Sequence, residues 1–220
     1  MKRADVVEFF ARLAADDPHP VTELEFVNPL TLLVAVVLSA QMTDAGVNKA
    51  TRSLFARADR PEAMAALGLE TIREHLATIN FNNTKAKNVL ALSEALVRDH
   101  GGAVPADRVS LEALPGVGRK TANVVLNSAF GHETFAVDTH IFRVCNRTGL
   151  AKGRDPLAVE LALEKVVPQP FRLHAHHWLI LHGRYTCKAR RPECWRCIVA
   201  DLCAFKPKTP PPAVSARERP

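Results

Sequence analysis

Four cysteines near the C-terminus have the spacing of a metal site. Six residues separate Cys187 from Cys194, two separate Cys194 from Cys197, and five separate Cys197 from Cys203. Four thiolates in so short a stretch can surround one tetrahedral centre, which is either zinc or a four-iron cluster. Spacing alone leaves both open, because both accept four sulfur ligands. Since the chain shows no export signal, we expect metal ligation here rather than disulfides.

The loop between the first two cysteines is basic. It carries Lys188, Arg190 and Arg191, and the stretch from Arg184 to Lys206 holds most of the formal net charge of +6. A metal that pins both ends of this loop would hold its cations in a fixed array that faces phosphates. A solvated basic loop is the simpler alternative. The net charge favours a polyanionic partner such as nucleic acid.

A glycine turn further upstream could bind a phosphate through its backbone. Within the stretch Leu114 to Ala122, two glycines flank one apolar residue, so the chain can turn tightly and expose successive N–H groups at the start of a helix. Such a turn would hold a sugar-phosphate backbone without reading its sequence. An ordinary loop turn is the alternative. The residues expected to contact DNA here are Gly116, Val117, Gly118 and Arg119.

Lys120 is the candidate nucleophile. It lies in the first turn of the helix that follows the glycines, on one face with Asn123 and Asn127. The helix dipole disfavours a cation at this end, which favours the neutral amine. A neutral amine can attack an electrophilic carbon and form a Schiff base. A phosphate-binding or merely solvated lysine is the alternative.

Eighteen residues after Lys120, Asp138 directly precedes another predicted helix. Its simplest role is to cap that helix. If the fold brings it near Lys120, its carboxylate can also shuttle protons or stabilise positive charge on a sugar ring. The helix buries one face, which includes Cys145, and carries His140, Arg143 and Arg147 on the opposite face. We expect His140 and Arg143 to contact DNA.

The elements that must position these residues are helices. Apolar residues recur at three- and four-residue spacing and no segment alternates with period two for long, so the sequence predicts an all-α protein. Thr84, Ser110 and Asp155 are the expected N-caps of three helices, and Gly149 ends another. The predicted helices are 5–15, 30–39, 44–58, 61–67, 70–78, 84–99, 110–113, 119–130, 139–148, 155–167 and 171–184.

The apolar run 30–40 is too short to span a membrane and is expected to be a buried helix. Because the chain shows neither a signal peptide nor a spanning helix, we expect a cytoplasmic protein without membrane contact.

Several stretches taken together are far more specific than any one of them. They are Leu38-Ser39-Ala40-Gln41, Leu114 to Asn127, Val137-Asp138-Thr139-His140-Ile141-Phe142-Arg143-Val144, His177-Trp178-Leu179-Ile180-Leu181-His182-Gly183-Arg184, and the four cysteines. With these motifs, which span the chain from about Leu30 to Cys203, the sequence resembles the helix-hairpin-helix DNA glycosylase family, and within it the endonuclease III group.

The resemblance implies a bifunctional DNA N-glycosylase and abasic-site lyase of base excision repair, which removes oxidised pyrimidines and then cleaves the backbone by β-elimination. Lys120 matches the family's nucleophile, which forms the Schiff base, and Asp138 matches its catalytic aspartate. The four cysteines match the ligands of the family's 4Fe-4S cluster. We expect a monomer that binds double-stranded DNA with a damaged base or an abasic site.

The family fold implies two helical domains with the active-site cleft between them. A six-helix domain that contains the helix-hairpin-helix would cover 22–131. The iron-sulfur cluster domain would combine 1–21 with 132–205. Residues 206–220 are rich in proline and would form a flexible tail.

An enzyme that flips a base out of DNA must also fill the space that the base leaves. The resemblance assigns this role to Gln41 and Phe81. The family usually has a glycine, a leucine and an aromatic residue where this chain has Asn80-Phe81-Asn82. Phe81 is still expected to act as a wedge. The departure puts the preferred lesion in question and leaves the chemistry unchanged.

Three other functions are weaker. An adenine-mismatch DNA glycosylase would lack a lysine at position 120 and carry a large further domain, whereas seventeen residues follow Cys203. A non-enzymatic helix-hairpin-helix DNA-binding module would need neither Lys120 nor Asp138. A metal-dependent hydrolase would need a carboxylate at ligand spacing from its histidines. Its candidate ligands, which packing explains better, are His174, His176, His177 and His182.

Overall fold

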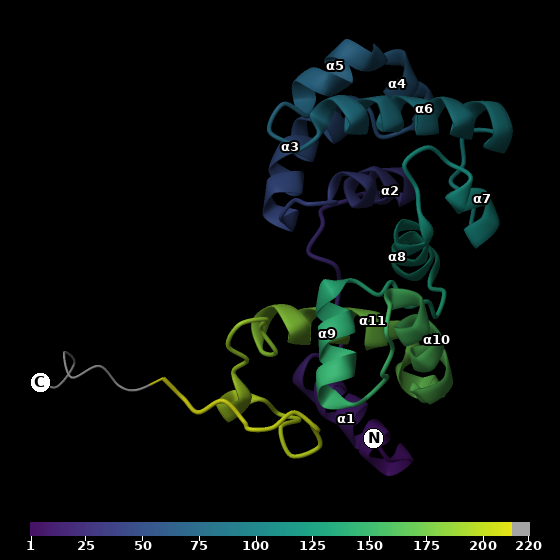
Figure 1. Cartoon of the computed structure of the whole chain (residues 1–220). Helices are drawn as coiled ribbons and strands as arrows, with labels where there is room; N and C mark the ends of the chain where they lie inside the picture. Colours follow the sequence, from purple (N-terminus) through teal and green to yellow (C-terminus); the bar gives the residue numbers. More distant parts are fainter. Residues whose placement is uncertain (213–220) are drawn as a thin grey trace, which may run out of the picture. The chain divides into compact units, whose positions relative to one another are not determined.

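The computed structural model describes residues 1–212, and within that range the regular elements are helices alone, as the sequence predicts. The chain forms two compact units. The central unit is Val21–Ala136, and the cysteine unit combines Met1–Pro20 with the chain from Val137 onward. Figure 1 labels their helices.

The central unit is built around one apolar helix, α2 (Pro29–Leu38). Asn28 caps it by accepting a hydrogen bond from the Thr31 N–H (3.0 Å), and Pro29 sits at its start, where a missing N–H breaks no helical bond. Every residue from Leu30 to Leu38 is buried, so this run is the predicted core helix. The other helices of the unit are α3 (Asp44–Arg57), α4 (Pro61–Ala66), α5 (Gly68–His75), α6 (Asn82–His100), α7 (Arg108–Glu112) and α8 (Arg119–Phe130).

Three helices pack directly on α2, and they are α3, α6 and α8. Figure 1 shows α4 and α5 lying along α6, which closes the far side of this core. The short helix α7 packs against α8, and the glycine turn joins these two neighbours. Helix α8, which carries the candidate nucleophile, and helices α2 and α6, which adjoin the turns of Gln41 and Phe81, therefore rest on one shared core.

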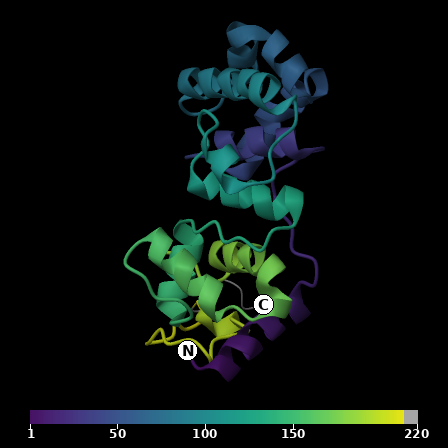
Figure 2. The ribbon, with the colours of Figure 1, turned by 90° about the vertical axis from the view of Figure 1, so that its right-hand side faces the viewer.

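The cysteine unit joins the two ends of the chain. Helix α1 (Arg3–Asp16) buries Phe9, and Arg12 pairs with Asp201 through both terminal nitrogens (2.7 and 3.1 Å). The indole N–H of Trp178 donates to the carbonyl of Asp17 (2.8 Å). Figure 2 shows α1, in purple, beside the yellow C-terminal segment. The other elements are α9 (Thr139–Thr148), α10 (Pro156–Val166), η1 (Gln169–Phe171), α11 (Arg172–Tyr185) and η2 (Cys194–Arg196).

Residues 132–136 belong to the central unit. The hydroxyl of Thr134 donates to the carbonyl of Asn123 (2.7 Å), and the Asn123 amide donates to the carbonyl of Phe135 (3.2 Å). The Phe135 side chain is fully buried. The domain boundary predicted from the sequence, at residue 131, follows the last helix of this domain. In the structure, hydrogen bonds with Asn123 of α8 also hold residues 134 and 135 in the unit.

Two predicted N-caps are wrong. Helix α6 begins two residues before Thr84, directly after Phe81, whose left-handed backbone turns the chain into the helix. Asp107, not Ser110, caps α7, because its carboxylate accepts a hydrogen bond from the Ser110 N–H (2.9 Å). In both cases the helix starts earlier than the apolar pattern indicates.

The other two predicted helix ends are confirmed. Asp155 caps α10 by accepting from the Ala158 N–H (2.8 Å), and Gly149 ends α9 in the left-handed conformation. Of the predicted proline-rich tail, 206–212 contains no helix, and 213–220 lies outside the described residues.

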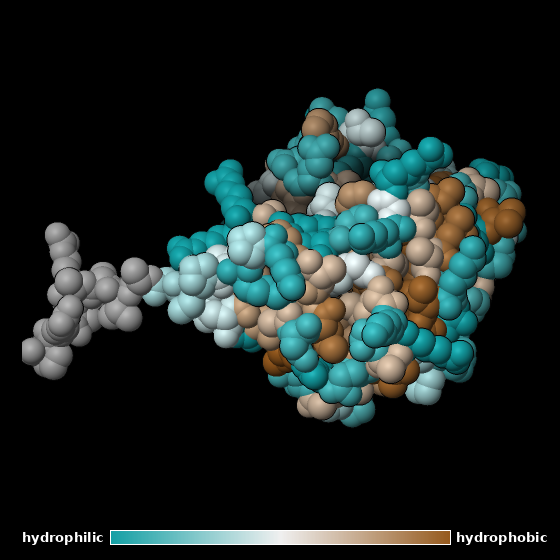
Figure 3. All heavy atoms as spheres, turned by 60° about the horizontal axis from the view of Figure 1, so that its bottom comes forward, coloured by the Kyte–Doolittle hydropathy of each residue, from teal (hydrophilic) through white to brown (hydrophobic). Residues whose placement is uncertain are grey.

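In residues 1–212, no helix combines the length and the apolar character needed to cross a membrane. The face of the molecule in Figure 3 mixes hydrophilic residues with separate hydrophobic patches.

Candidate active site and metal centre

The turn between α7 and α8 contains one glycine that the fold requires and one that it does not. Gly116 has a φ of +77°, and a Cβ there would lie 2.7 Å from the side-chain nitrogen of Asn88. Gly118 has a φ of −104°, and a Cβ there would meet no atom within 4 Å. Packing therefore explains Gly116, whereas Gly118 leaves open space beside the backbone that a ligand can enter.

Helix α8 begins without a side-chain cap. Its N-cap is Gly118, which has no side chain to accept hydrogen bonds from the first N–H groups. Free N–H groups and the positive end of the helix dipole favour an anion at this end. Val117 packs in the core, so its predicted contact with DNA involves the backbone alone, and Arg119 is half-buried.

Lys120 is exposed in the first turn of α8 and makes no hydrogen bond or ion pair within the central unit. The rest of its predicted face is buried instead of exposed. The amide of Asn123 donates to the carbonyl of Phe135 (3.2 Å), and that of Asn127 donates to the carbonyl of His132 (2.9 Å). Lys120 is therefore the accessible end of a face that residues 132–136 otherwise cover.

Gln41 and Phe81 share an unusual backbone conformation. Within residues 1–212 they are the only non-glycine residues with a positive φ, which is 58° in each. Both are exposed, and Phe81 leaves 64% of its surface accessible. A left-handed backbone is rare for a large side chain and marks a position that its surroundings constrain.

Asp138 caps α9 as predicted. One oxygen, Oδ1, accepts hydrogen bonds from the N–H groups of His140 (2.9 Å) and Ile141 (2.8 Å). The residue is half-buried, and its Oδ2 has no hydrogen-bond partner within the cysteine unit. The carboxylate is thus held by one oxygen and leaves the other for chemistry. His140 is half-buried too, with Nδ1 lying 3.2 Å from a terminal nitrogen of Arg143.

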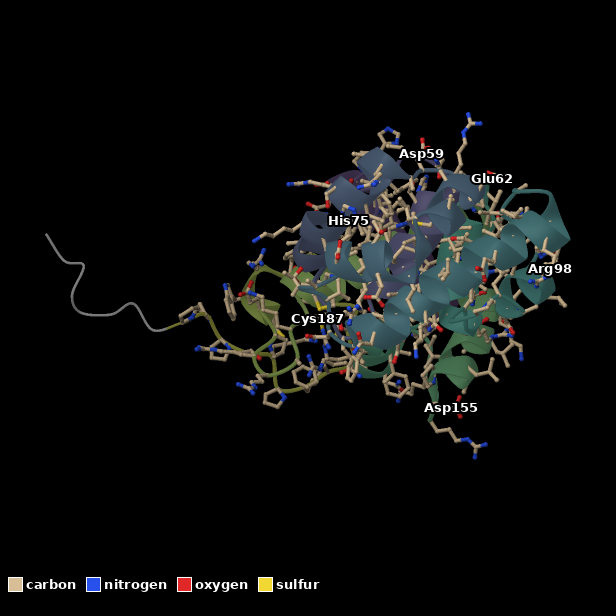
Figure 4. The ribbon with its side chains drawn as sticks, turned by 90° about the horizontal axis from the view of Figure 1, so that it is seen from above. Asp59, Glu62, His75, Arg98, Asp155 and Cys187 are labelled. Carbon is tan, nitrogen blue, oxygen red and sulfur yellow. The ribbon has the colours of Figure 1, made fainter. Side chains whose placement is uncertain are left out.

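The four predicted cysteines line one pocket, which is partly open to solvent. Cys187 is labelled in Figure 4, and its neighbours in the wall include Arg147, His182 and Phe205. Within residues 1–212, no three His, Cys, Asp or Glu side chains are arranged to hold a single metal ion. Four cysteine side chains in one pocket form a donor set that suits a centre with four sulfur ligands.

The groups around the sulfurs also fit a cluster. Burial raises the pKa of Cys197 to about 11, so its thiol keeps the proton unless a positive centre replaces it. Burial lowers the pKa of His182 to about 4, and the Nε2 of this neutral ring lies 3.7 Å from the Cys197 sulfur. The Phe205 N–H donates to the sulfur of Cys203 (3.4 Å). Such hydrogen bonds support ligating thiolates.

Two arginines of α9 hold the start of the cysteine segment, a role that the sequence analysis misses. Arg147 donates to the carbonyl of Lys188 (2.8 Å) and lies 3.5 Å from the Cys187 sulfur. Arg143 donates to the carbonyls of Cys187 (2.9 Å) and Gly183 (2.7 Å). Their four-residue spacing on one face of α9 is the signal, but it does not name the segment that they meet. The predicted contact of Arg143 with DNA stays a prediction.

The three basic residues of the loop differ in whether they make hydrogen bonds or ion pairs. Lys188 donates to Glu193 (2.7 Å), and hydrogen bonds from Lys188 and then Arg196 hold the pKa of Glu193 below its usual range. Arg190 and Arg191 are exposed and make no hydrogen bond or ion pair within the cysteine unit. Figure 4 shows nitrogen-tipped side chains on the yellow-green segment of this unit.

The histidines of the weaker hydrolase hypothesis pack against neighbouring rings. The rings of His176 and His177 lie edge to face at 5.1 Å, and His174 lies 5.6 Å from Trp178. His182 lines the cysteine pocket.

Comparison with known proteins agrees with these observations. Residues 34–169 match the HhH-GPD superfamily base excision DNA repair protein family, and residues 187–203 match the iron-sulfur binding domain of endonuclease III. Endonuclease III of Escherichia coli strain K12 is 56% identical over 94% of this chain and 99% of its own length. Endonuclease III of Haemophilus influenzae is 55% identical over the same shares.

A solved structure of a trapped endonuclease III–DNA covalent intermediate has a TM-score of 0.86 and 41% sequence identity, and the match covers 93% of this chain and 96% of that one. Neither a passive DNA-binding module nor an adenine-mismatch glycosylase explains such similarity over nearly the whole length. The chain therefore belongs to the HhH-GPD superfamily of base excision DNA repair proteins, as a DNA glycosylase and abasic-site lyase of the endonuclease III type that carries a 4Fe-4S cluster.

Proposed function

We propose that this enzyme removes oxidised pyrimidines from double-stranded DNA through a Schiff base on Lys120. The observation that carries the proposal is the exposed amine of Lys120, which has no partner within its unit and stands beside the uncapped start of α8. An amine without a protein partner, next to an anion-binding helix end, is suited to reach the sugar of a bound nucleotide.

The reaction begins when Nζ of Lys120 attacks the anomeric carbon of the damaged nucleotide. A C–N bond forms, the glycosidic bond breaks, and its electron pair leaves with the base. The sugar ring opens to give an imine, and loss of a proton from C2′ then expels the 3′ phosphate oxygen, which cleaves the strand. The imine acts as the electron sink that makes this elimination possible.

Asp138 is the candidate group for the proton transfers that accompany these steps. Its Oδ1 is occupied by two backbone N–H groups, while its Oδ2 has no partner within its unit. A fixed carboxylate can stabilise positive charge on the sugar and move a proton between successive intermediates. Lys120 belongs to the central unit and Asp138 to the cysteine unit.

The remaining predicted residues bind DNA in this proposal. The backbone of the glycine turn and the side chains of Arg190 and Arg191 contact phosphates, while Gln41 and Phe81 fill the space of the flipped base. The cluster would hold the basic loop in place. The other residues predicted to contact DNA are Gly116, Val117, Gly118, Arg119, His140, Arg143, Lys188, Arg190 and Arg191. The residues predicted to hold the cluster are Cys187, Cys194, Cys197 and Cys203.

Borohydride reduction of the Schiff base tests the proposal directly. We expect the wild-type enzyme to form a stable covalent complex with duplex DNA that contains an abasic site. Lys120→Ala should lose this complex but still bind the same DNA. A covalent complex that persists in Lys120→Ala would place the nucleophile elsewhere. A panel of duplexes, each with one defined lesion, tests the preference for oxidised pyrimidines. Sedimentation tests the expected monomer, and the cytoplasmic location stays a prediction.

A further inference from the structure

The turns that carry the two wedge residues are tied to each other. The side-chain amide of Asn80 donates to the carbonyl of Gln41 (2.8 Å), and the Asn80 N–H lies 3.4 Å from the sulfur of Met42. Asn80 directly precedes Phe81 in the chain. Each wedge residue therefore sits in a turn whose position depends on the other turn.

A buried lysine makes a second tie between the same turns. Lys85 of α6 is 6% exposed, and its ammonium donates to the carbonyls of Leu38 (2.9 Å) and Ala40 (2.6 Å). These carbonyls lie where α2 ends and the chain turns toward Gln41. The Lys85 N–H also donates to the carbonyl of Phe81 (3.0 Å). One residue thus bonds to both turns, through its side chain and through its backbone.

Burial lowers the pKa of Lys85, so its place in the structure disfavours a charged amine. The two carbonyl acceptors offset that penalty and satisfy the end of α2, whose last carbonyls have no partner inside the helix. Removal of the amine would leave polar backbone groups without partners at the base of the Gln41 turn.

We propose that Asn80 and Lys85 are positioning residues that hold Gln41 and Phe81 as one rigid pair, so that both side chains enter the DNA together. This inference rests on the proposed function of Gln41 and Phe81. The Asn80 bond sets this chain apart from the family's usual pattern, because a glycine at this position has no side-chain amide to donate. Because the spacing between Gln41 and Phe81 is preformed, less conformational entropy is lost when their side chains enter the DNA duplex.

The test compares two substrates with the same abasic site, one duplex and one single strand. A single strand has no stacked partner base to hold apart, so wedge placement matters only in the duplex. We expect Asn80→Ala and Lys85→Met to lower the single-turnover lyase rate on the duplex by about tenfold and to leave the single-strand rate unchanged. Matched controls are Asn83→Ala and Lys87→Met, which remove the same groups from exposed neighbours that make no hydrogen bond or ion pair within the central unit.

A second measurement reports wedge entry without any reaction. A tetrahydrofuran site, which cannot form a Schiff base, is placed opposite 2-aminopurine, whose fluorescence rises when it loses its stacking. The rise on binding should shrink in Asn80→Ala and remain in Asn83→Ala. Because Asn80 is exposed, this variant keeps its fold even if Lys85→Met loses stability.

The inference would be overturned, and the proposed function left standing, if the variants lost equal lyase rate on both substrates. The same holds if Asn80→Ala behaved like Asn83→Ala in both rate and fluorescence. A wild-type enzyme that forms no borohydride-trapped complex on either substrate would overturn the proposed function and this inference with it.

Discussion

The guanidinium of Arg147 donates a hydrogen bond to the carbonyl of Lys188 over 2.8 Å, and a second one reaches Ala189 (3.0 Å). The same side chain lies over the ring of Phe205, with 5.0 Å between its central carbon and the ring centre. One residue of α9 thus fixes the start of the basic loop from one side and the segment after the last cysteine from the other. This arrangement makes Arg147 a support for the cysteine segment and for the basic loop.

Arg147→Met keeps most of the side-chain length but leaves these carbonyls without a charged donor. Hydrogen bonds to charged groups contribute about 1.5–3 kcal/mol each, so the loop should loosen. We expect faster loss of the cluster and weaker binding of DNA. Visible absorbance in the iron-sulfur range follows the cluster over time. Arg154→Met, a change at an exposed arginine whose side chain is 95% accessible, serves as the control and should not alter the rate of loss.

The two glycines of the hairpin should respond differently to alanine. Gly116→Ala forces a side chain into the left-handed region and against Asn88, which should lower the free energy of unfolding by about 1–3 kcal/mol. Gly118→Ala meets open space and an extended backbone, so stability should stay near the wild-type value while DNA affinity falls. Thermal unfolding and DNA titrations separate the two effects. Unchanged affinity in Gly118→Ala would argue against a phosphate at this turn.

The charge and the capping role of Asp138 can be separated. Asparagine caps a helix about as well as aspartate, so Asp138→Asn should keep α9 intact and lose catalytic rate. Asp138→Ala should lose the rate and also about 1 kcal/mol of stability. Single-turnover kinetics and thermal unfolding of both variants distinguish these results. An active Asp138→Asn enzyme would limit this residue to its structural role.

The exposed arginines of the basic loop should control the salt dependence of binding. Each phosphate that a cation neutralises contributes about −0.9 to the slope of log affinity against log salt concentration. The double change Arg190→Ala with Arg191→Ala should therefore flatten that slope by about 1.8. The matched double change, Arg98→Ala with Arg154→Ala, removes two exposed cations that already pair with aspartates and should leave the slope unchanged. Equal slopes in the two variants would contradict the assigned surface.

The wedge residue should be under conflicting demands of stability and function. Phe81 is exposed in a left-handed conformation, which costs about 1–2 kcal/mol for a residue with a Cβ. Asparagine tolerates this conformation better, so Phe81→Asn should match or exceed wild-type stability while the duplex reaction slows. Phe81→Leu, which restores the residue that the family usually has, should keep the duplex rate. Denaturant unfolding measures the stability of the variants, and single-turnover kinetics on duplex DNA measure their reaction rates.

The all-α fold and the candidate chemical groups could be predicted from the sequence because each depends on local pattern. Helical periodicity marks the helices, a glycine turn before Lys120 marks a helix start, and Asp138 marks a cap that the structure confirms. Four cysteines in one short segment are close together in any fold. Helix starts at Thr84 and Ser110 could not be placed as well, because the residues that begin those helices lie outside the apolar pattern.

Packing in three dimensions sets which distant segments meet. Asn80 bonds to Gln41 across 39 positions of the chain, and Lys85 bonds to Leu38 across 47. These hydrogen bonds cannot be predicted from residue type and spacing, because a polar side chain near the end of a helix can equally well be hydrated by solvent. The identity of the groups that could act follows from the residue types and their local spacing. The packing of α2 against α6 decided how the wedge residues are held, since only packing sets the distance between turns that the chain keeps far apart.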